Sequence, residues 1–249
     1  MRKLLLLFLI ITISQTLYSQ NKIYHSAAGE MIFGFSDASY TSGNSGVLGN
    51  NNEGSITGPM RWTIWFHLGF YSHYDFNNSI GLYTGIVNRN VGFITSEKPS
   101  ENGLTDNVKW KRRAYTLGIP LAIKFGNMEK GMYMFVGAQY DMFYHYKEKE
   151  FLPSGKRKYT EWFSDRVNLF IPSVFVGITF PDGLSLKFTY ELNDMMNKDF
   201  VINTTAGTVK PYENMTSRLM YASLYTMLVW KDTYSKITKE EKKLMAQSY

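Results

Sequence analysis

The stretch that decides the fold is Leu184-Ser185-Leu186-Lys187-Phe188-Thr189-Tyr190-Glu191-Leu192-Asn193. Apolar side chains occupy every even position and polar side chains every odd position. Because successive side chains of a β-strand point to opposite faces, the stretch predicts a strand with one apolar face and one polar face. The turn-forming sequence Pro181-Asp182-Gly183 stands directly before it, so residues 167–180 are predicted to supply the hairpin partner.

The same period of two recurs along the chain and predicts eight strands in all. The other seven cover residues 27–36, 60–71, 79–94, 113–125, a segment that begins at 132, 167–180 and 215–230. In the segment from 132, His145 falls on the same polar parity as Asp141. Pro120 interrupts an otherwise regular strand, and proline cannot donate a ladder hydrogen bond, so we expect a bulge or an interrupted ladder there.

The predicted connections alternate between long polar loops and short turns. The loops cover residues 37–58, 95–108, 149–166 and 195–214, and the turns cover 73–78, 127–131 and 181–183. Outer-membrane barrels have long loops on one side, short turns on the other and an even number of strands. The pattern therefore predicts an all-β fold, a transmembrane antiparallel up-and-down β-barrel of about eight strands, followed by a short C-terminal helical tail.

The first residues have the order of a secretory signal peptide. Met1, Arg2 and Lys3 precede an apolar run over residues 4–13, which is too short to span a bilayer as a helix. We expect cleavage after Ser19; an uncleaved anchor is the alternative. The expected organisation is a signal peptide at 1–19, an outer-membrane β-barrel at 20–230 and a charged periplasmic tail at 231–249.

Composition excludes several classes of protein. The chain has no cysteine, so a lipid-anchored cysteine, a disulfide framework and a thiolate metal site are ruled out. The net charge is +6, but the basic residues are scattered, and we expect no nucleic-acid partner. A soluble lipocalin-like barrel would show the same alternation with inverted faces. Aromatic residues at strand ends favour the membrane version; they are Tyr71, Tyr74, Phe125, Tyr144, Tyr146, Phe180 and Trp230.

Charged residues on the polar faces are the candidate site. The lumen of an eight-stranded barrel is only wide enough for side chains, so a polar network is predicted from Arg61, Lys124, Asp141, Lys187 and Glu191, with Glu30 as a further member. Such a cluster is structural when its charges are paired, and a conducting or ligand-binding role is the alternative. The four histidines are far apart and show no metal-ligand spacing. We expect no catalytic residue, no metal and no cofactor.

Short motifs resemble a known family. Residues 115–125 (YTLGIPLAIKF), the Gly137-centred segment 132–140, the strand GLYTG at 81–85 and the sequence LYSQ at 17–20 resemble the Bacteroidetes outer-membrane β-barrel family that includes the PorT-like proteins. The resemblance implies the fold and the outer membrane as location; a few members resemble accessory parts of the type IX secretion and gliding apparatus. Such barrels usually end on an aromatic residue, whereas here a tail follows Trp230.

The expected function is that of a non-enzymatic outer-membrane β-barrel protein, either structural or an accessory subunit of a membrane complex such as the type IX secretion or gliding machinery. A small-molecule binding or transport barrel and a lipid-modifying enzyme are the alternatives. The expected partners are outer-membrane lipid and proteins that bind through the extracellular loops or the C-terminal tail.

Overall fold

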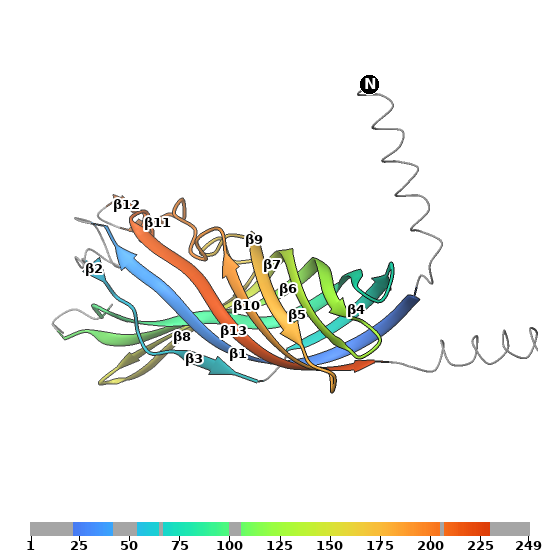
Figure 1. Ribbon diagram of the computed structural model, residues 1–249. Coiled ribbons are helices and arrows are strands. Elements are labelled where there is room, and N and C mark those ends of the chain that lie inside the picture. The colour runs from blue at the N-terminus through green and yellow to red at the C-terminus, as the bar shows by residue number, and fades with distance from the viewer. Residues whose placement is uncertain (1–21, 42–53, 65–66, 100–105, 205–206, 230–249) are drawn as a thin grey trace, which may run out of the picture.

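The computed structural model describes residues 22–41, 54–64, 67–99, 106–204 and 207–229 (Figure 1). Its strands are β1 (Lys22–Tyr40), β2 (Gly54–Ser55), β3 (Arg61–Thr63), β4 (Leu68–Asp75), β5 (Ile80–Glu97), β6 (Val108–Asn127), β7 (Met132–Leu152), β8 (Gly155–Trp162), β9 (Phe170–Thr179), β10 (Leu184–Glu191), β11 (Ile202–Thr204), β12 (Gly207–Val209) and β13 (Met215–Val229). Among these residues no helix has the length and apolarity to cross a membrane.

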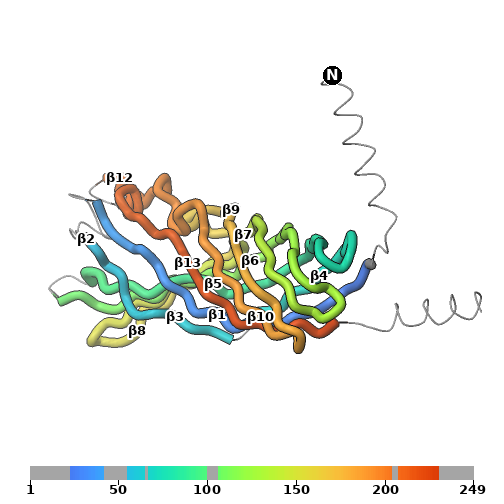
Figure 2. The backbone as a smooth tube through the Cα atoms, viewed as in Figure 1, coloured from blue at the N-terminus to red at the C-terminus, as the bar shows by residue number. Residues whose placement is uncertain are grey.

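The sheet closes into a barrel with eight strand positions around its circumference, each of which is called a wall below. The antiparallel order is β13-β10-β9-β7-β6-β5-β4-β1, and β1 pairs in turn with β13 from Ser26–Val229 to Tyr40–Met215. Strands β3 and β4 both pair with β1 and form one wall, so the single strand predicted at 60–71 is divided in two. The start of β1 and the end of β13 lie together at the end that carries the short turns, the turn end (Figure 2). The opposite end, with β2, β8, β11 and β12, is the loop end.

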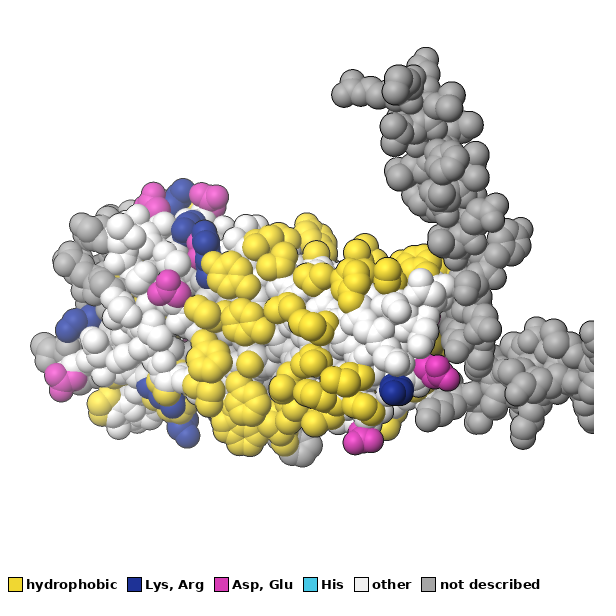
Figure 3. All heavy atoms as spheres, in the orientation of Figure 1, with side chains coloured by type: hydrophobic (Ala, Val, Ile, Leu, Met, Phe, Trp, Pro, Cys, Tyr) yellow, Lys and Arg dark blue, Asp and Glu magenta, His cyan; other side chains and the backbone are white. Residues whose placement is uncertain are grey.

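Apolar side chains cover the outside of the barrel. On β6, Ile119 and Leu121 are 61% and 60% exposed, whereas Lys124 between two exposed neighbours is fully buried. On β10 the apolar even positions face outward and Lys187 and Glu191 are buried. On the face that Figure 3 shows, yellow side chains cover the middle of the barrel and the part toward the turn end, and charged side chains lie mostly at the loop end with a few at the turn end. A soluble barrel would need these rows inside, so the lipocalin-like alternative is excluded.

The height of the apolar band matches a bilayer. On β6 it extends from Tyr115 to Phe125, which is about 33 Å of strand, or about 25 Å of height at the usual tilt of about 40°. That is the height expected of the lipid-facing band of an outer-membrane barrel. Residues of β6 before Tyr115 therefore lie beyond the hydrocarbon layer.

The short turns require particular residues. Gly183 adopts φ 79°, a left-handed conformation, and a Cβ there would stand 2.7 Å from the Met227 carbonyl oxygen. The predicted turn at 181–183 is present, and β4–β5 and β6–β7 are joined by similarly short turns.

Strand β6 is irregular at two places. The β5–β6 ladder lacks pairs for Ile119 and Pro120 without a change of register, which is the interrupted ladder expected at the proline. The register shift lies elsewhere, between the pairs Tyr115–His145 and Thr116–Phe143, so Tyr144 is the additional residue of a β-bulge. Past this bulge the outward parity of β7 changes from even to odd. The prediction that His145 shares the polar inner parity of Asp141 is therefore wrong.

Strands extend into two of the predicted loops. Residues 149–166 contain the end of β7 and the whole of β8, which form a hairpin beyond the barrel wall, and β5 and β6 extend into 95–108. These extensions are highly charged, so hydrophobic alternation does not mark them. Tyr71 and Tyr146, predicted at the membrane surface, are instead buried inside the barrel.

Three expectations fall on residues outside the described ranges. They are the signal peptide at 1–19, the aromatic strand end at Trp230 and the helical tail at 231–249.

A charge placed on the lipid face tests the orientation of the barrel. We expect Leu121→Arg, near the middle of the apolar band, to lower the free energy of unfolding by about 2–4 kcal/mol, because arginine is poorly tolerated at the bilayer midplane. Ile23→Arg, close to the turn end, should cost no more than about 1 kcal/mol. Denaturant titration of protein folded into phosphatidylcholine vesicles measures both. Equal losses would contradict the assigned lipid face.

Candidate functional site: the lumen network

Buried charged and aromatic side chains fill the barrel at three levels. The turn-end cluster contains Lys124 and Asp75, the central cluster contains Glu30, Arg89 and Lys187, and the loop-end cluster is centred on Arg112. Aromatic side chains pack between the first two levels; they include Tyr83, Tyr133, Phe135, Phe175 and Tyr225. Since an eight-stranded barrel has room for little more than side chains, these groups occupy its lumen.

In the turn-end cluster, Lys124 is held by several groups at once. Its ammonium pairs with the Asp75 carboxylate and donates to the Tyr24 hydroxyl at 3.0 Å. It also lies 5.0 Å and 5.1 Å from the ring centroids of Tyr24 and Tyr133. The cation is thus neutralised by one carboxylate and surrounded by aromatic faces, which makes its burial tolerable.

The turn-end cluster also holds a serine–histidine pair, which the spacing of the sequence does not reveal. Ser26 Oγ lies 2.9 Å from His73 Nε2, and Lys124 Nζ lies 3.4 Å from His73 Nδ1. Because an ammonium can only donate, Nδ1 accepts and Nε2 carries the proton that it donates to Ser26. A catalytic triad needs the reverse arrangement, with a carboxylate at Nδ1 and a serine that donates to Nε2. This pair is therefore not arranged to activate a nucleophile.

The central cluster connects four walls of the barrel. Glu30 of β1 accepts from Arg89 Nε at 2.8 Å and pairs with Lys187 Nζ at 2.9 Å. Asp141 accepts from Gln139 Nε2 at 2.6 Å. Glu191 is buried close to Asp141, which carries the same charge, and to Arg89, which carries the opposite charge.

The structure brings together only part of the predicted set. Lys187, Asp141 and Glu191 lie in the central cluster with Glu30, and Lys124 lies apart in the turn-end cluster. Arg61 belongs to neither: its guanidinium donates to Asn90 at 3.0 Å (backbone O) and 2.6 Å (Oδ1). Arg89 was missed because the alternation of residues 79–94 is weak, although its odd parity matches the buried Tyr83 and Val87.

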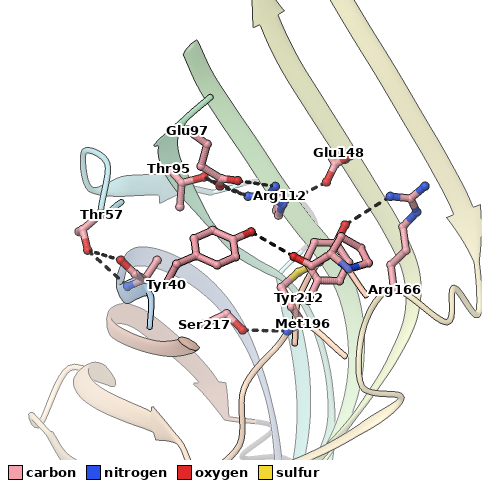
Figure 4. Close-up of polar contacts among 12 residues, drawn as sticks. Tyr40, Thr57, Thr95, Glu97, Arg112, Glu148, Arg166, Met196, Tyr212 and Ser217 are labelled. Carbon is pink, nitrogen blue, oxygen red and sulfur yellow. Dashed lines mark hydrogen bonds and ion pairs between the residues drawn. The ribbon is translucent and has the colours of Figure 1, made fainter. Parts of the chain in front are cut away.

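The loop-end cluster surrounds Arg112, which is completely buried (Figure 4). Its Nε donates to Glu148 at 3.0 Å, its Nη1 donates to Thr95 at 3.0 Å, and its Nη1 and Nη2 hold the Glu97 carboxylate, the latter at 3.1 Å. The Tyr146 hydroxyl donates to Glu148 at 2.8 Å. Arg112 thus joins β5, β6 and β7 beyond the apolar band, and two of its partners, Thr95 and Glu97, fall within the loop predicted at 95–108.

The segment between β10 and β13 closes over this cluster. Tyr212 is buried, and Arg166 Nη1 donates to its hydroxyl at 3.3 Å (Figure 4). The Arg166 guanidinium also lies 4.3 Å from the Tyr159 ring centroid, on β8. Burial, reinforced by the nearby Glu148 carboxylate, raises the pKa of Tyr212 to about 12. Further hydrogen bonds, from Met196 N to Ser217 Oγ at 2.9 Å and from Tyr40 to the Pro211 carbonyl at 3.5 Å, fix the segment across the loop end.

The closed ring, the apolar outer band and the charged, filled lumen define the class of protein. The chain is a small transmembrane β-barrel of the outer-membrane type, and its location is the cell outer membrane. Within the described ranges, no three His, Cys, Asp or Glu residues are grouped as they would be to hold a metal ion.

Comparisons with known proteins give structural matches only. No protein-family model matches the chain, and no curated protein matches it. Ail, the attachment invasion locus protein of Yersinia pestis, in complex with the heparin analogue sucrose octasulfate, is 12% identical over 83% of this chain and 99% of its own, with a TM-score of 0.31. Neisserial surface protein A is 12% identical over 84% of this chain and 99% of its own, with a TM-score of 0.35.

Removing the central cation of the loop-end cluster tests whether the cluster stabilises the barrel. We expect Arg112→Met to lower the free energy of unfolding by about 3–5 kcal/mol, because Glu97 and Glu148 would remain buried without their partner. The triple variant Arg112→Met/Glu97→Gln/Glu148→Gln should recover most of the loss. Lys210→Met, which removes the exposed pair with Asp199, should change stability by less than about 1 kcal/mol. Denaturant titration compares the variants; a loss for Arg112→Met as small as that for Lys210→Met would show that the cluster is not stabilising.

Proposed function

We propose that this protein is a non-enzymatic outer-membrane barrel that acts as a structural protein or as an accessory subunit of a membrane complex, such as a type IX secretion or gliding machine. The observation that carries the proposal is the lumen, which paired charges and aromatic rings occupy at three successive levels. A barrel filled in this way works through the surfaces that it presents. The resemblance of residues 115–125 to PorT-like proteins supports the choice of complex.

The loop end is an ordered surface suited to binding a protein partner, and this surface is called the platform below. The β7–β8 hairpin extends the sheet beyond the apolar band, and Arg166 ties it to the Tyr212 segment. Two short antiparallel strand pairs, β11 with β12 and β2 with β1, also order the backbone at this end. An ordered surface loses little conformational entropy when it binds a partner.

The two alternative functions are transport through the lumen and enzymatic modification of a lipid, and the arrangement of the described residues suits neither. Transport through the lumen would require the ion pairs of Glu30 and Arg112 to break at two levels. A lipid-modifying enzyme would require an accessible nucleophile that donates its proton to a general base. Ser26 and His73 are both buried, and His73 donates to Ser26 instead of accepting from it.

Electrical recording tests the closed lumen. We expect the protein, reconstituted in a planar lipid bilayer, to show no steady conductance, because side chains fill its cross-section. A 16-stranded porin inserted under the same conditions is the positive control. Stepwise openings that scale with salt concentration would overturn the closed-lumen proposal and favour the transport alternative.

Photo-crosslinking in whole cells tests the platform. A photoreactive residue in place of Glu161 or Asp199, both at the exposed loop end, should yield adducts with a protein partner. The same residue in place of Glu129, in the exposed turn between β6 and β7, should yield none. Adducts from position 129 alone, or adducts that disappear when residues 231–249 are removed, would place the partner on the periplasmic side and contradict a loop-end platform.

A further inference from the structure

The outward face of β6, β7 and β8 beyond the apolar band is strongly basic. The bulge at Tyr144 turns the odd positions of β7 outward, so they continue the outward row of β6, and the hairpin adds a third row from β8. The seven cations of this basic face are Lys109, Lys111, Arg113, Lys147, Lys149, Lys156 and Lys158.

The register places like charges side by side. Lys111, Lys149 and Lys158 stand directly opposite one another on three neighbouring strands, and Arg113 stands opposite Lys147. Their Cβ atoms are about 5 Å apart across the strands and about 7 Å apart along them. Like charges in directly opposed positions destabilise a sheet, so this arrangement is unfavourable unless an anion joins it.

Within the described chain, no carboxylate forms an ion pair with any cation of the basic face. Glu148 and Glu150 of β7, and Glu97 of the neighbouring β5, are buried on the opposite side of the sheet. Glu161 of β8 stands opposite the buried Tyr146, so it also lies on that side. Arg113 Nε is buried without a hydrogen-bond partner. Burial, together with the neighbouring cations, holds the pKa of Lys111 and of Lys149 below its ordinary value, as expected of a surface whose charge is not neutralised.

The basic face adjoins the apolar band through a row of aromatic side chains. Tyr115, His145 and Trp162 lie side by side on the three strands, with ring centroids 5.5 Å and 4.6 Å apart. Together with Asn88 and Tyr144 they line an open pocket of about 190 Å³. Tyrosine and tryptophan mark the level of the headgroups in membrane proteins, so Arg113 and Lys147, the next outward residues, stand at headgroup height.

We propose that the basic face binds the phosphate groups of phosphorylated lipids in the outer leaflet, while the aromatic pocket below contacts the adjoining sugar or acyl part of the same lipid. Charge complementarity supports an anionic ligand, and the unbroken junction with the lipid-facing band supports a lipid over a soluble polyanion. The inference is independent of whether the lumen is closed.

Binding of diphosphoryl lipid A to the full-length protein in maltoside micelles tests the proposal. The variant Lys111→Gln/Arg113→Gln/Lys147→Gln/Lys149→Gln should bind at least about tenfold more weakly, since each lysine or arginine near an anionic lipid surface contributes measurably. The control, Lys130→Gln/Lys198→Gln/Lys210→Gln/Arg218→Gln, loses the same charge at exposed positions elsewhere and should bind within about twofold of the natural protein. Both variants are first checked for the heat-dependent gel shift of a folded barrel. The single variant Lys149→Gln, with a smaller expected loss, serves if the fourfold variant does not fold.

Two probes separate the lipid from other sources of the same charge. Lipid A without its phosphates should bind weakly to all variants, and heparin should not compete with diphosphoryl lipid A at equal charge concentration. Equal lipid A binding by the basic-face variant and the control would overturn the proposal. Tight heparin binding that displaces lipid A would also overturn it, and would identify the face as a site for soluble polyanions.

Discussion

The structure depends on one constraint: in the hydrocarbon layer every backbone N–H and C=O must find its partner within the protein. The long antiparallel pairing of β1 with β13 meets that constraint, because it joins the first and last walls and leaves the ring without an open edge. Closure in turn fixes two surfaces of opposite character. The outside takes the apolar parity of each strand, and the inside receives every polar side chain that the lipid excludes.

The polar inside then has to be neutralised in little space. Charges from distant parts of the chain meet there: Glu30 with Arg89 and Lys187 in the middle, Lys124 with Asp75 at the turn end, and Arg112 with two glutamates at the loop end. Each pair crosses between walls, so the ion pairs also hold the walls in register. A lumen occupied in this way leaves the outer surfaces as the parts of the molecule that can interact, which is why the proposed roles concern a platform at the loop end and a basic face at headgroup height.

A single additional residue has the largest consequence for the surface. The bulge at Tyr144 reverses the parity of β7, so that Glu148 and Glu150 turn inward while Lys147 and Lys149 turn outward. The mixed sequence of alternating lysine and glutamate is thereby sorted into a buried acidic row, which pairs with Arg112 and Arg157, and an exposed basic row. Without the bulge the same residues would place acids outside and unpaired lysines inside.

The sequence by itself determined the class of fold, because a two-residue period over long strands and the alternation of loops with turns follow directly from backbone geometry. It also identified Lys187, Asp141, Glu191 and Lys124 as inward polar residues, since each interrupts an apolar strand on a fixed parity. Only the tertiary structure decided the rest. Arg89 and the pairing of Glu30 with Arg89 and Lys187 depend on strands remote in sequence. The Tyr144 bulge leaves no mark in hydrophobic alternation, and the charged ends of β5 to β8 resemble loops until inter-strand pairing joins them. Register and closure are properties of the whole ring, and no single strand encodes them.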